Sequence, residues 1–304
     1  MRSNDFAYPK PGLLGSLLSA AANSRMLGSV RRAIFSRLPF VRLESDVSDI
    51  VYLNWVIPSR VAGEEVPPGV RILDVGGATI LTVLTYRHGG FGPSLLGPLR
   101  RLYLAEVPPG ATAGNTVLFL KNIFDSAIYA VGTRVFSDAL PSHKALEFTH
   151  RKQGDRYVTS ITAGMGSAPE LSCVAAKSVS KELPTEFQRF FASWEQAVEY
   201  LCLQDAAICA VPGANRIAQA GIELPIDTSR VIPLAPVNYV PGVYLRRLQA
   251  EGAPFCFVVP SVKFKVLWER LLPDLPAHDA AMALSGQIVE GERTMPRRSG
   301  ERIT

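Results

Sequence analysis

The side chains best suited to chemistry lie in one stretch of the chain, residues 117–150. Lys121 is the single charge in an apolar run at the start of this stretch, and a proline further on is followed directly by Ser142, His143 and Lys144. A lysine amine attacks a ketone only where desolvation or a neighbouring cation lowers its pKa. Lys121 and Lys144 are therefore the candidates for Schiff-base chemistry, and His143 is the candidate general base.

Simpler interpretations compete with these roles. Either lysine could be structural or solvated; Lys121 would reach water if it lies near a strand end. His150, on an apolar face, would be a core histidine with its hydrogen bonds satisfied. The four histidines share no ligand spacing, and the four cysteines form no C-x-x-C pair. The sequence also lacks a phosphate-binding glycine loop and a nucleophile elbow, so we predict no metal, no cofactor and buried, reduced cysteines.

The elements that must position these side chains can be read from apolar spacing. The run Val117–Phe124 predicts a buried strand. Asp125 and Ser126 are good helix caps, and helical spacing continues from there to the break at Pro141. Arg134 and Asp138 are four residues apart and could pair on the exposed side of this helix. Alternating residues on either side of a Gln-Gly-Asp turn then predict a hairpin over 145–162.

The rest of the chain is rich in predicted strands. We expect strands at Val51–Ile57, Arg71–Val75, Ala78–Tyr86, Arg100–Val107, Leu171–Lys177 and Phe255–Val259. Thr185 and Gln188 have the spacing of a capping box, which predicts a helix with an apolar face running from Phe187 to Leu201. Val262–Leu272 should close the domain as a helix or turn.

Charge is concentrated at the N-terminus. Residues 1–45 carry seven basic and two acidic residues, 7 − 2 = +5, which equals the net charge of the 304-residue chain. The remainder is close to neutral, which argues against nucleic-acid binding. We predict a basic amphipathic extension over 1–47, a main domain over 48–272 and a disordered tail over 273–304. The extension would pack on the domain or tether loosely; a peripheral membrane contact and a targeting-like segment are the alternatives.

Several segments together resemble a bacterial family related to acetoacetate decarboxylase. They are N-W-V-I-P at 54–58, V-P-P-G-V at 66–70, the strand, helix and Leu-Pro stretch of 117–141, and the late helix at 195–203. The resemblance covers roughly residues 48–270. It implies a mainly β (α+β) fold, either a cone-shaped antiparallel β-barrel or highly curved sheets with a few helices packed outside. The wide end of such a barrel would hold a small-molecule pocket.

The chain departs from this family where the chemistry should be. The decarboxylase uses a Schiff-base lysine with a second lysine beside it, after an aromatic-Pro pair. Here those two positions fall on Ser142 and His143, and Lys144 is one or two residues away, on the opposite face of a strand. The resemblance also implies acidic and arginine side chains in the pocket. Glu106 is the candidate acid, and Ser142, Arg134 and Tyr103 are the candidate substrate contacts.

Two functions from different classes follow. In the first, the protein is an enzyme of the decarboxylase superfamily that acts on a small keto or carboxylate compound, without being a true acetoacetate decarboxylase. In the second, it is a non-catalytic barrel that binds an apolar small molecule or a lipid. We expect a cytoplasmic protein in either case, with a small-molecule ligand, no nucleic acid, and a membrane-peripheral position as the alternative.

Overall fold

The computed structural model describes residues 5–35, 43–89, 92–93, 115–140, 142–211 and 216–272. The predicted strand at 100–107, with Tyr103 and Glu106, lies outside the described residues, as does the predicted tail from residue 273.

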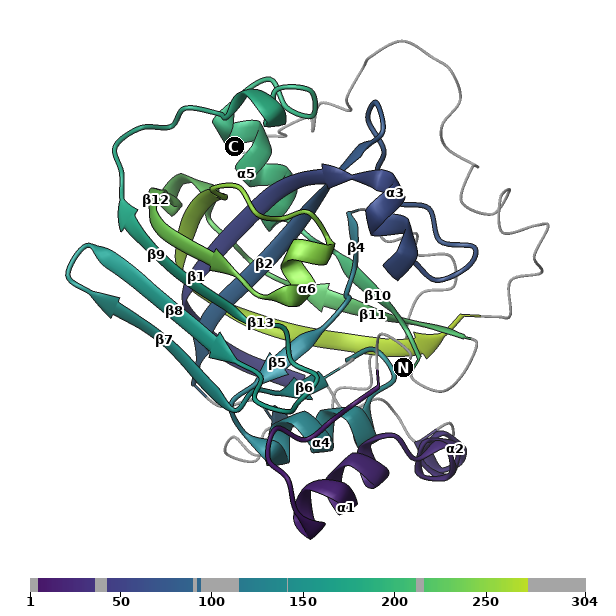
Figure 1. The fold of residues 1–304 in the computed structure, drawn as a ribbon. Helices are drawn as coiled ribbons and strands as arrows, with labels where there is room; N and C mark the ends of the chain where they lie inside the picture. The colour runs from purple at the N-terminus through teal and green to yellow at the C-terminus, as the bar shows by residue number, and fades with distance from the viewer. Residues whose placement is uncertain are drawn as a thin grey trace, which may run out of the picture.

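One mixed sheet of 11 strands makes up most of the described chain, and it is strongly curved (Figure 1). Its hydrogen-bonded order is β4 (Thr116–Leu118), β10 (Ala206–Ala210), β11 (Ile217–Glu223), β13 (Phe255–Leu271), β12 (Ile232–Pro241), β9 (Leu171–Lys177), β8 (Arg156–Thr162) and β7 (Glu147–Gln153). β1 (Leu43–Pro58) pairs with β13 and carries β2 (Ala78–His88) and β3 (Gly92–Pro93) on its other edge. Only the β4–β10 pair of this sheet is parallel among the described residues.

The mainly β class with a few helices is thus confirmed. The strand pairs of the described residues form an open, branched order and no closed ring, so the barrel stays a prediction. A separate two-stranded parallel sheet joins β5 (Asn122–Phe124) to β6 (Ser142–Lys144). Helix α4 (Ala127–Phe136) provides the crossover that parallel strands require.

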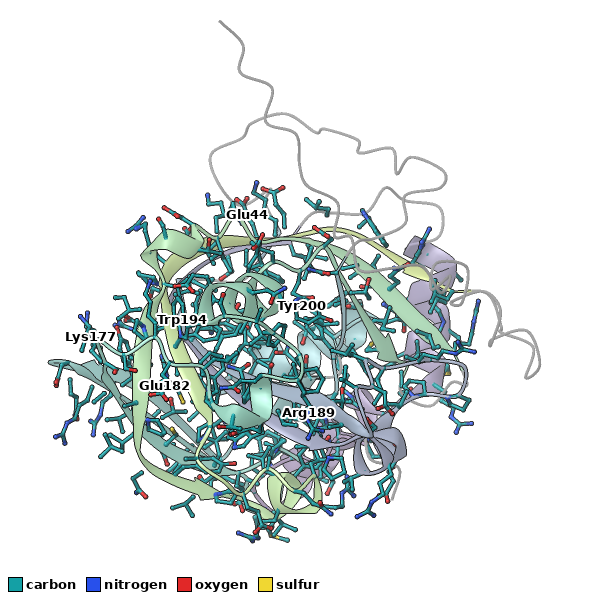
Figure 2. The ribbon with its side chains drawn as sticks, turned by 90° about the horizontal axis from the view of Figure 1, so that it is seen from above. Glu44, Lys177, Glu182, Arg189, Trp194 and Tyr200 are labelled. Carbon is teal, nitrogen blue, oxygen red and sulfur yellow. The ribbon has the colours of Figure 1, made fainter. Side chains whose placement is uncertain are left out.

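Apolar cores cover both faces of the sheet. Side chains alternate along β13, so Phe257 lies in one core and Val258 in the other. The core around Val258 includes residues of α6 (Val243–Arg247), and the core around Phe257 includes α5 (Trp194–Cys202). Figure 2 looks down on the molecule from the side of α5: Trp194 lies inside the outline, whereas Lys177 lies at its edge.

Residues 5–35 pack against the outside of this frame. Phe6 is buried, its backbone N–H donates to Asn23 Oδ1, and the N–H of Ala7 donates to Ser167 Oγ. Helices α1 (Leu13–Ala22) and α2 (Arg25–Phe35) then form a layer with α4 below the sheet in Figure 1. Each helix of the described chain is too short or too polar to span a lipid bilayer. The division into extension, domain and tail remains a prediction.

The predicted strand at 117–124 is interrupted. β4 pairs with β10 in the large sheet, whereas β5 pairs with β6 in the small one. The chain must change sheets between them, so residues 119–121 belong to neither strand and Lys121 lies in the link. The sequence of a continuous apolar run does not show where the chain passes from one sheet to another, because both halves of the run are equally suited to a strand.

Three other predicted elements were wrong. Val262–Leu272 continues β13 instead of forming a helix or turn; Val262, Phe264 and Val266 alternate with lysines, a period-two pattern typical of a strand. The predicted strand Arg71–Val75 is a loop with a single bridge, from Val75 to Ala78. The predicted helix after Thr185 is only a 3₁₀ turn, Thr185–Phe187.

The long helix begins at α5 because a different capping box serves it. Ser193 Oγ accepts from the N–H of Gln196, and Gln196 Oε1 accepts from the N–H of Ala192. Trp194, Val198 and Leu201 form the buried face of α5, as predicted, whereas Phe187 and Phe191 are buried in the same core but precede the helix. The hairpin of β7 and β8 is also confirmed, with Gly154 at a φ of 63° in its turn.

Candidate functional site

Lys121 lies at the centre of a group of polar side chains drawn from distant parts of the chain. The link between β4 and β5 places its Nζ 3.4 Å from His143 Nε2. The same ammonium lies 5.3 Å from the ring centroid of Tyr244 on α6. Lys121 is half-buried at the margin of the core that contains Leu120 and Ile123. It is therefore no solvated strand-end lysine.

His143 is fully buried, in the middle of the three-residue strand β6. Its Nδ1 lies 2.7 Å from Ser167 Oγ, and that hydroxyl also accepts from the N–H of Ala7 at 2.9 Å. The ring of Phe6 stacks on the imidazole at a centroid distance of 6.5 Å. Ser167 and the N-terminal segment thus hold the ring so that its other nitrogen faces Lys121.

The surroundings of His143 keep its imidazole neutral. Burial is the main cause that lowers its pKa, to about 2, and the cations of Lys121 and Arg134 act in the same direction. A neutral imidazole can donate or accept one hydrogen bond at Nε2, but it cannot store a proton near neutral pH. The predicted general base is therefore better suited to orienting the amine than to carrying its proton.

Arg134 and Ser142 form the hydrogen-bonded surroundings of β6, the strand that contains His143. The Nε of Arg134 donates to the carbonyl oxygen of Ala22 at 3.2 Å, and its NH1 donates to that of Ser142 at 3.1 Å. Ser142 Oγ accepts from Thr133 Oγ1 at 2.7 Å. The expectation of an exposed pair between Arg134 and Asp138 was wrong: Arg134 is buried in the helical layer, and Asp138 pairs with two other arginines.

Glu65 and Arg247 complete the group and contact Tyr244, the ring that lies next to Lys121. Tyr244 Oη donates to Glu65 Oε2 at 3.3 Å, and Arg247 forms an ion pair with Glu65 Oε1. Glu65 ends the 3₁₀ turn Gly63–Glu65, which follows α3 (Ser59–Ala62), and its side chain is only 5% exposed. The side chain of Arg247 is 50% exposed, so one cation of this group faces solvent.

These neighbours lower the basicity of Lys121. Burial is the main cause, and it takes the pKa of the amine to about 8; Glu65 opposes the shift, whereas Arg134 and Arg247 add to it. At pH 7 a group with this pKa is unprotonated about one time in ten, against roughly one in three thousand for an ordinary lysine. Lys121 thus has the desolvated, cation-flanked environment that activates lysine nucleophiles.

Lys144 lies elsewhere. It follows His143 on β6, so its side chain leaves the strand on the other face, and its Nζ donates to the carbonyl oxygen of Ala145. Burial lowers its pKa, with Asp125 opposing and Lys10 assisting. Of the predicted site residues, Lys121, His143, Arg134 and Ser142 are brought together, Lys144 is set apart, and Glu106 and Tyr103 lie outside the described residues.

His150 proves to be the satisfied histidine that was expected. Its Nδ1 lies 2.8 Å from Thr159 Oγ1, and its Nε2 lies 2.7 Å from the carbonyl oxygen of Asp49. Across the described part of the chain, no three histidine, cysteine, aspartate or glutamate side chains are grouped closely enough to hold a metal ion.

Sequence reasoning missed Ser167, Glu65, Tyr244 and Arg247. Ser167 sits in a glycine-rich turn, Gly-Met-Gly-Ser, whose spacing indicates only a turn. Glu65 precedes the Val-Pro-Pro-Gly segment, and Tyr244 and Arg247 occupy one face of a five-residue helix. None of these signals links one segment to another, and only the tertiary fold brings them to Lys121.

No protein-family model matches the chain, and no curated protein matches its sequence. Solved structures of the enduracididine biosynthesis enzyme MppR, with HEPES buffer bound and in complex with pyruvate, are 12% identical over 78% of this chain and 90–91% of theirs, with TM-scores of 0.49 and 0.48. The acetoacetate decarboxylase of Legionella pneumophila is 10% identical over 77% of this chain and 88% of its own, with a TM-score of 0.38. Acetoacetate decarboxylase, the enzyme named in the sequence resemblance, is thus among the proteins of similar structure.

Proposed function

We propose that the chain is an enzyme related to acetoacetate decarboxylase that acts on a small keto compound, in which Lys121 forms a Schiff base with the keto group of the substrate. The observation that carries this proposal is the position of the Lys121 amine, half-buried between His143 and Tyr244 with a pKa of about 8. The curved sheet would enclose the substrate as the cone-shaped barrel implied by the sequence resemblance.

Each neighbour of Lys121 has a role in this chemistry. Neutral Lys121 attacks the carbonyl carbon, the carbonyl oxygen leaves as water with the two amine protons, and one proton from solvent converts the imine to an iminium ion. His143 orients the amine through Nε2. Tyr244 and Glu65, joined by their 3.3 Å hydrogen bond, are the groups that would exchange protons with the carbonyl oxygen.

A substrate carboxylate would bind at Arg247. This guanidinium is half exposed and already faces Glu65, whereas Arg134 is buried and donates to two backbone carbonyl groups. Arg134 therefore tunes the site through its charge, and Ser142 fixes the position of β6. This assignment replaces Arg134 with Arg247 as the contact to substrate.

Reductive trapping tests the proposal. The full chain is incubated with a panel of small ketones and 2- and 3-keto acids, reduced with borohydride, and examined by intact-mass analysis and peptide mapping. We expect an adduct on Lys121 that is lost in Lys121→Met. Lys144→Met is the matched control and should be labelled like the unmodified protein. An absence of adducts with every compound, or labelling of Lys144 alone, would remove the imine mechanism.

The second candidate function is a non-catalytic pocket for an apolar small molecule. It is favoured by the low pKa of His143, which makes that histidine too weak a base to take up a proton near neutral pH, and by the aromatic rings of Phe6 and Tyr244. Native mass spectrometry of the purified protein distinguishes the two. An unmodified ligand that is retained by Lys121→Met supports binding alone.

A further inference from the structure

The helical layer below the sheet exposes most of the large apolar side chains on the surface. Nine of the 17 that the described residues expose lie on three helices: Leu13, Leu14 and Leu17 on α1; Met26, Leu27, Val30 and Ile34 on α2; Ile128 and Phe136 on α4. These nine residues are called the helical apolar face below. A surface that concentrates apolar side chains in this way marks an interaction site, whereas scattered ones are ordinary.

The opposite side of α2 is fixed to the body of the protein. Arg31 is buried and forms an ion pair with Asp138, and Arg32 NH1 lies 3.1 Å from the same carboxylate. Met26, Val30 and Ile34 are spaced four residues apart, so they form one stripe along the helix, away from these arginines. Their side chains are 72%, 51% and 53% exposed. The ion pairs thus hold the apolar stripe toward solvent.

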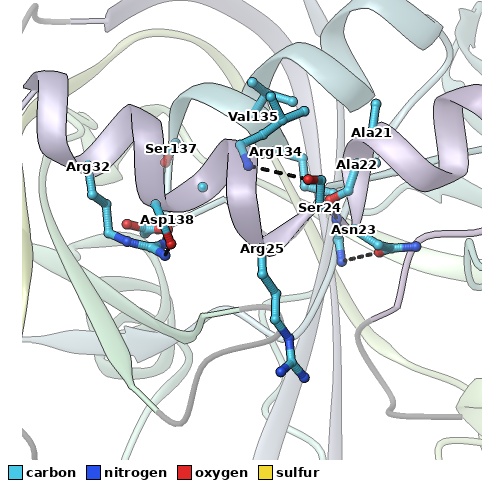
Figure 3. Close-up of a pocket in the computed structure, with 13 residues that line it drawn as sticks. Ala21, Ala22, Asn23, Ser24, Arg25, Arg32, Arg134, Val135, Ser137 and Asp138 are labelled. Atoms are coloured by element: carbon cyan, nitrogen blue, oxygen red, sulfur yellow. Dashed lines mark hydrogen bonds and ion pairs between the residues drawn. The ribbon is translucent and has the colours of Figure 1, made fainter.

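The three helices lie together, because α4 contacts both α1 and α2. A cleft of about 250 Å³ runs between the α1–α2 link and α4, and both Leu27 and Val135 line it (Figure 3). At Gly15, α1 packs closely on the segment that precedes it, since an added Cβ would lie 2.6 Å from the carbonyl oxygen of Lys10. Of the helical apolar face, Leu27 lines the cleft.

The charge on α1 and α2 is basic, whereas the exposed Asp125 precedes α4. Neither α1 nor α2 contains an acidic residue, and Lys10 and Arg25 are exposed beside the apolar side chains. Arg25 lines the cleft, and its side chain is exposed (Figure 3). A second copy of the chain docked here would bring like charges together. An anionic lipid surface complements both features, since it accepts aliphatic side chains below the headgroups and attracts lysine and arginine beside them.

We propose that the helical apolar face docks on the surface of an anionic membrane. α1 and α2 would lie in the plane of the interface, with Leu14, Leu17, Val30 and Ile34 among the acyl chains. Because both helices are already folded and held by the body of the protein, binding would not have to order them first. The proposal is independent of the chemistry assigned to Lys121.

Vesicle flotation with the full chain tests this assignment. We expect the protein to float with phosphatidylcholine vesicles that contain about one third phosphatidylserine, to float less at high salt, and to stay behind with pure phosphatidylcholine vesicles. The triple variant Met26→Ser, Val30→Ser, Ile34→Ser should bind at least about tenfold more weakly, because three inserted side chains are lost. Its thermal midpoint should be unchanged, because all three side chains are exposed.

The matched control is Val237→Ser, Val240→Ser, Val243→Ser, three valines that are 56%, 52% and 71% exposed on β12 and α6. It should bind like the unmodified protein. A polarity-sensitive dye on Leu17→Cys gives an independent readout, since the four native cysteines are buried. Three results would overturn the proposal: no flotation, equal binding to neutral vesicles, or a dimer by light scattering that the α2 triple variant converts to monomer.

Discussion

The charged amine of Lys121 is less stable in the folded protein than in water, because the fold partly buries it. Its pKa is about 8 in the folded protein and 10.5 in the unfolded chain, so folding is opposed below pH 8, where the buried site must hold a charge. The opposition fades between pH 8 and 10.5 and is absent above that range. A residue retained at such a cost is a functional candidate.

Lys121→Met should therefore stabilise the protein at neutral pH. We expect a gain of about 1–2 kcal/mol in the free energy of unfolding at pH 7, after allowing for partial solvent exposure, and no gain at pH 10.5. Urea unfolding at the two pH values measures both. A loss of stability at pH 7 would mean that Lys121 is held by interactions stronger than its burial.

His143 should make the protein sensitive to acid. Its pKa is about 2 when folded and 6.5 when unfolded, so the unfolded chain takes up a proton below pH 6.5 that the folded protein cannot accept. Stability should fall by as much as about 1.4 kcal/mol per pH unit below pH 6.5 from this residue alone. In His143→Gln the slope between pH 6 and 4 should be shallower by about that amount. Parallel slopes for the two proteins would contradict the assigned burial.

A site residue could be predicted only where its own segment of the sequence distinguishes it. Lys121 was selected because it is the single charge in an apolar run, and His143 because it follows the break at Pro141. Glu65 and Arg247 are among the 59 charged residues of the chain, and nothing in their own segments distinguishes them. Arg134 was assigned to the surface because its spacing to Asp138 suits a helix pair, and burial under the N-terminal segment overrides that preference.

At the scale of elements, a buried charge cluster joins α2 to the sheet. Glu269 of β13 accepts from Ser137 Oγ at 2.5 Å through Oε2 and from the N–H of Asp138 at 2.6 Å through Oε1, and Arg31 NH1 lies 3.7 Å from Oε1. Burial raises the pKa of Glu269, and the hydrogen bonds of residues 137 and 138 oppose that shift. Arg31 thus pairs with two carboxylates, those of Asp138 and Glu269, and Arg32 pairs with Asp138 as well.

Arg31→Met should release α2 from the body of the protein. The substitution leaves Glu269 without its arginine, and an uncompensated buried charge costs about 3–5 kcal/mol, whereas Asp138 keeps its ion pair with Arg32. We expect faster amide hydrogen exchange over 25–35 and a lower urea midpoint. Lys181→Met, which breaks an exposed pair with Glu195, is the control and should change stability by less than about 1 kcal/mol. Unchanged exchange in α2 would show that apolar contacts suffice to hold it.

Elements with local signals were predicted well. The β7–β8 hairpin has a glycine turn between two alternating runs, and α4 follows two capping residues. β13 was divided wrongly because Pro260 and Ser261 interrupt its apolar run. In the structure Ser261 pairs with Ser48 of β1, and Pro260 lies between two residues that pair with β1, Val259 and Ser261. Pairing with β1 thus continues the strand through Pro260 and Ser261, which the sequence pattern alone indicates as the end of a strand.

At the scale of the whole molecule, β1 and β13 are shared by both cores. Phe257 is fully buried on the α5 side and Leu53 is fully buried on the other. Phe257→Ala should cost about 3–5 kcal/mol and speed amide exchange over 194–202, because the ring contacts Trp194. Leu53→Ala should cost about 2–5 kcal/mol without that local effect. Equal exchange of α5 in both variants would indicate a single cooperative core.

The order of the elements along the chain has a consequence for biosynthesis. α2 ends at Phe35, whereas its docking partners Asp138 and Glu269 are translated roughly 100 and 230 residues later. At about 5–20 residues per second, the complete ion-pair cluster becomes available only roughly 10–50 seconds after α2. During that interval the inner, arginine-bearing side of the nascent helix is uncovered together with the helical apolar face. A chaperone or an early lipid contact would therefore protect α2 until its partners are made.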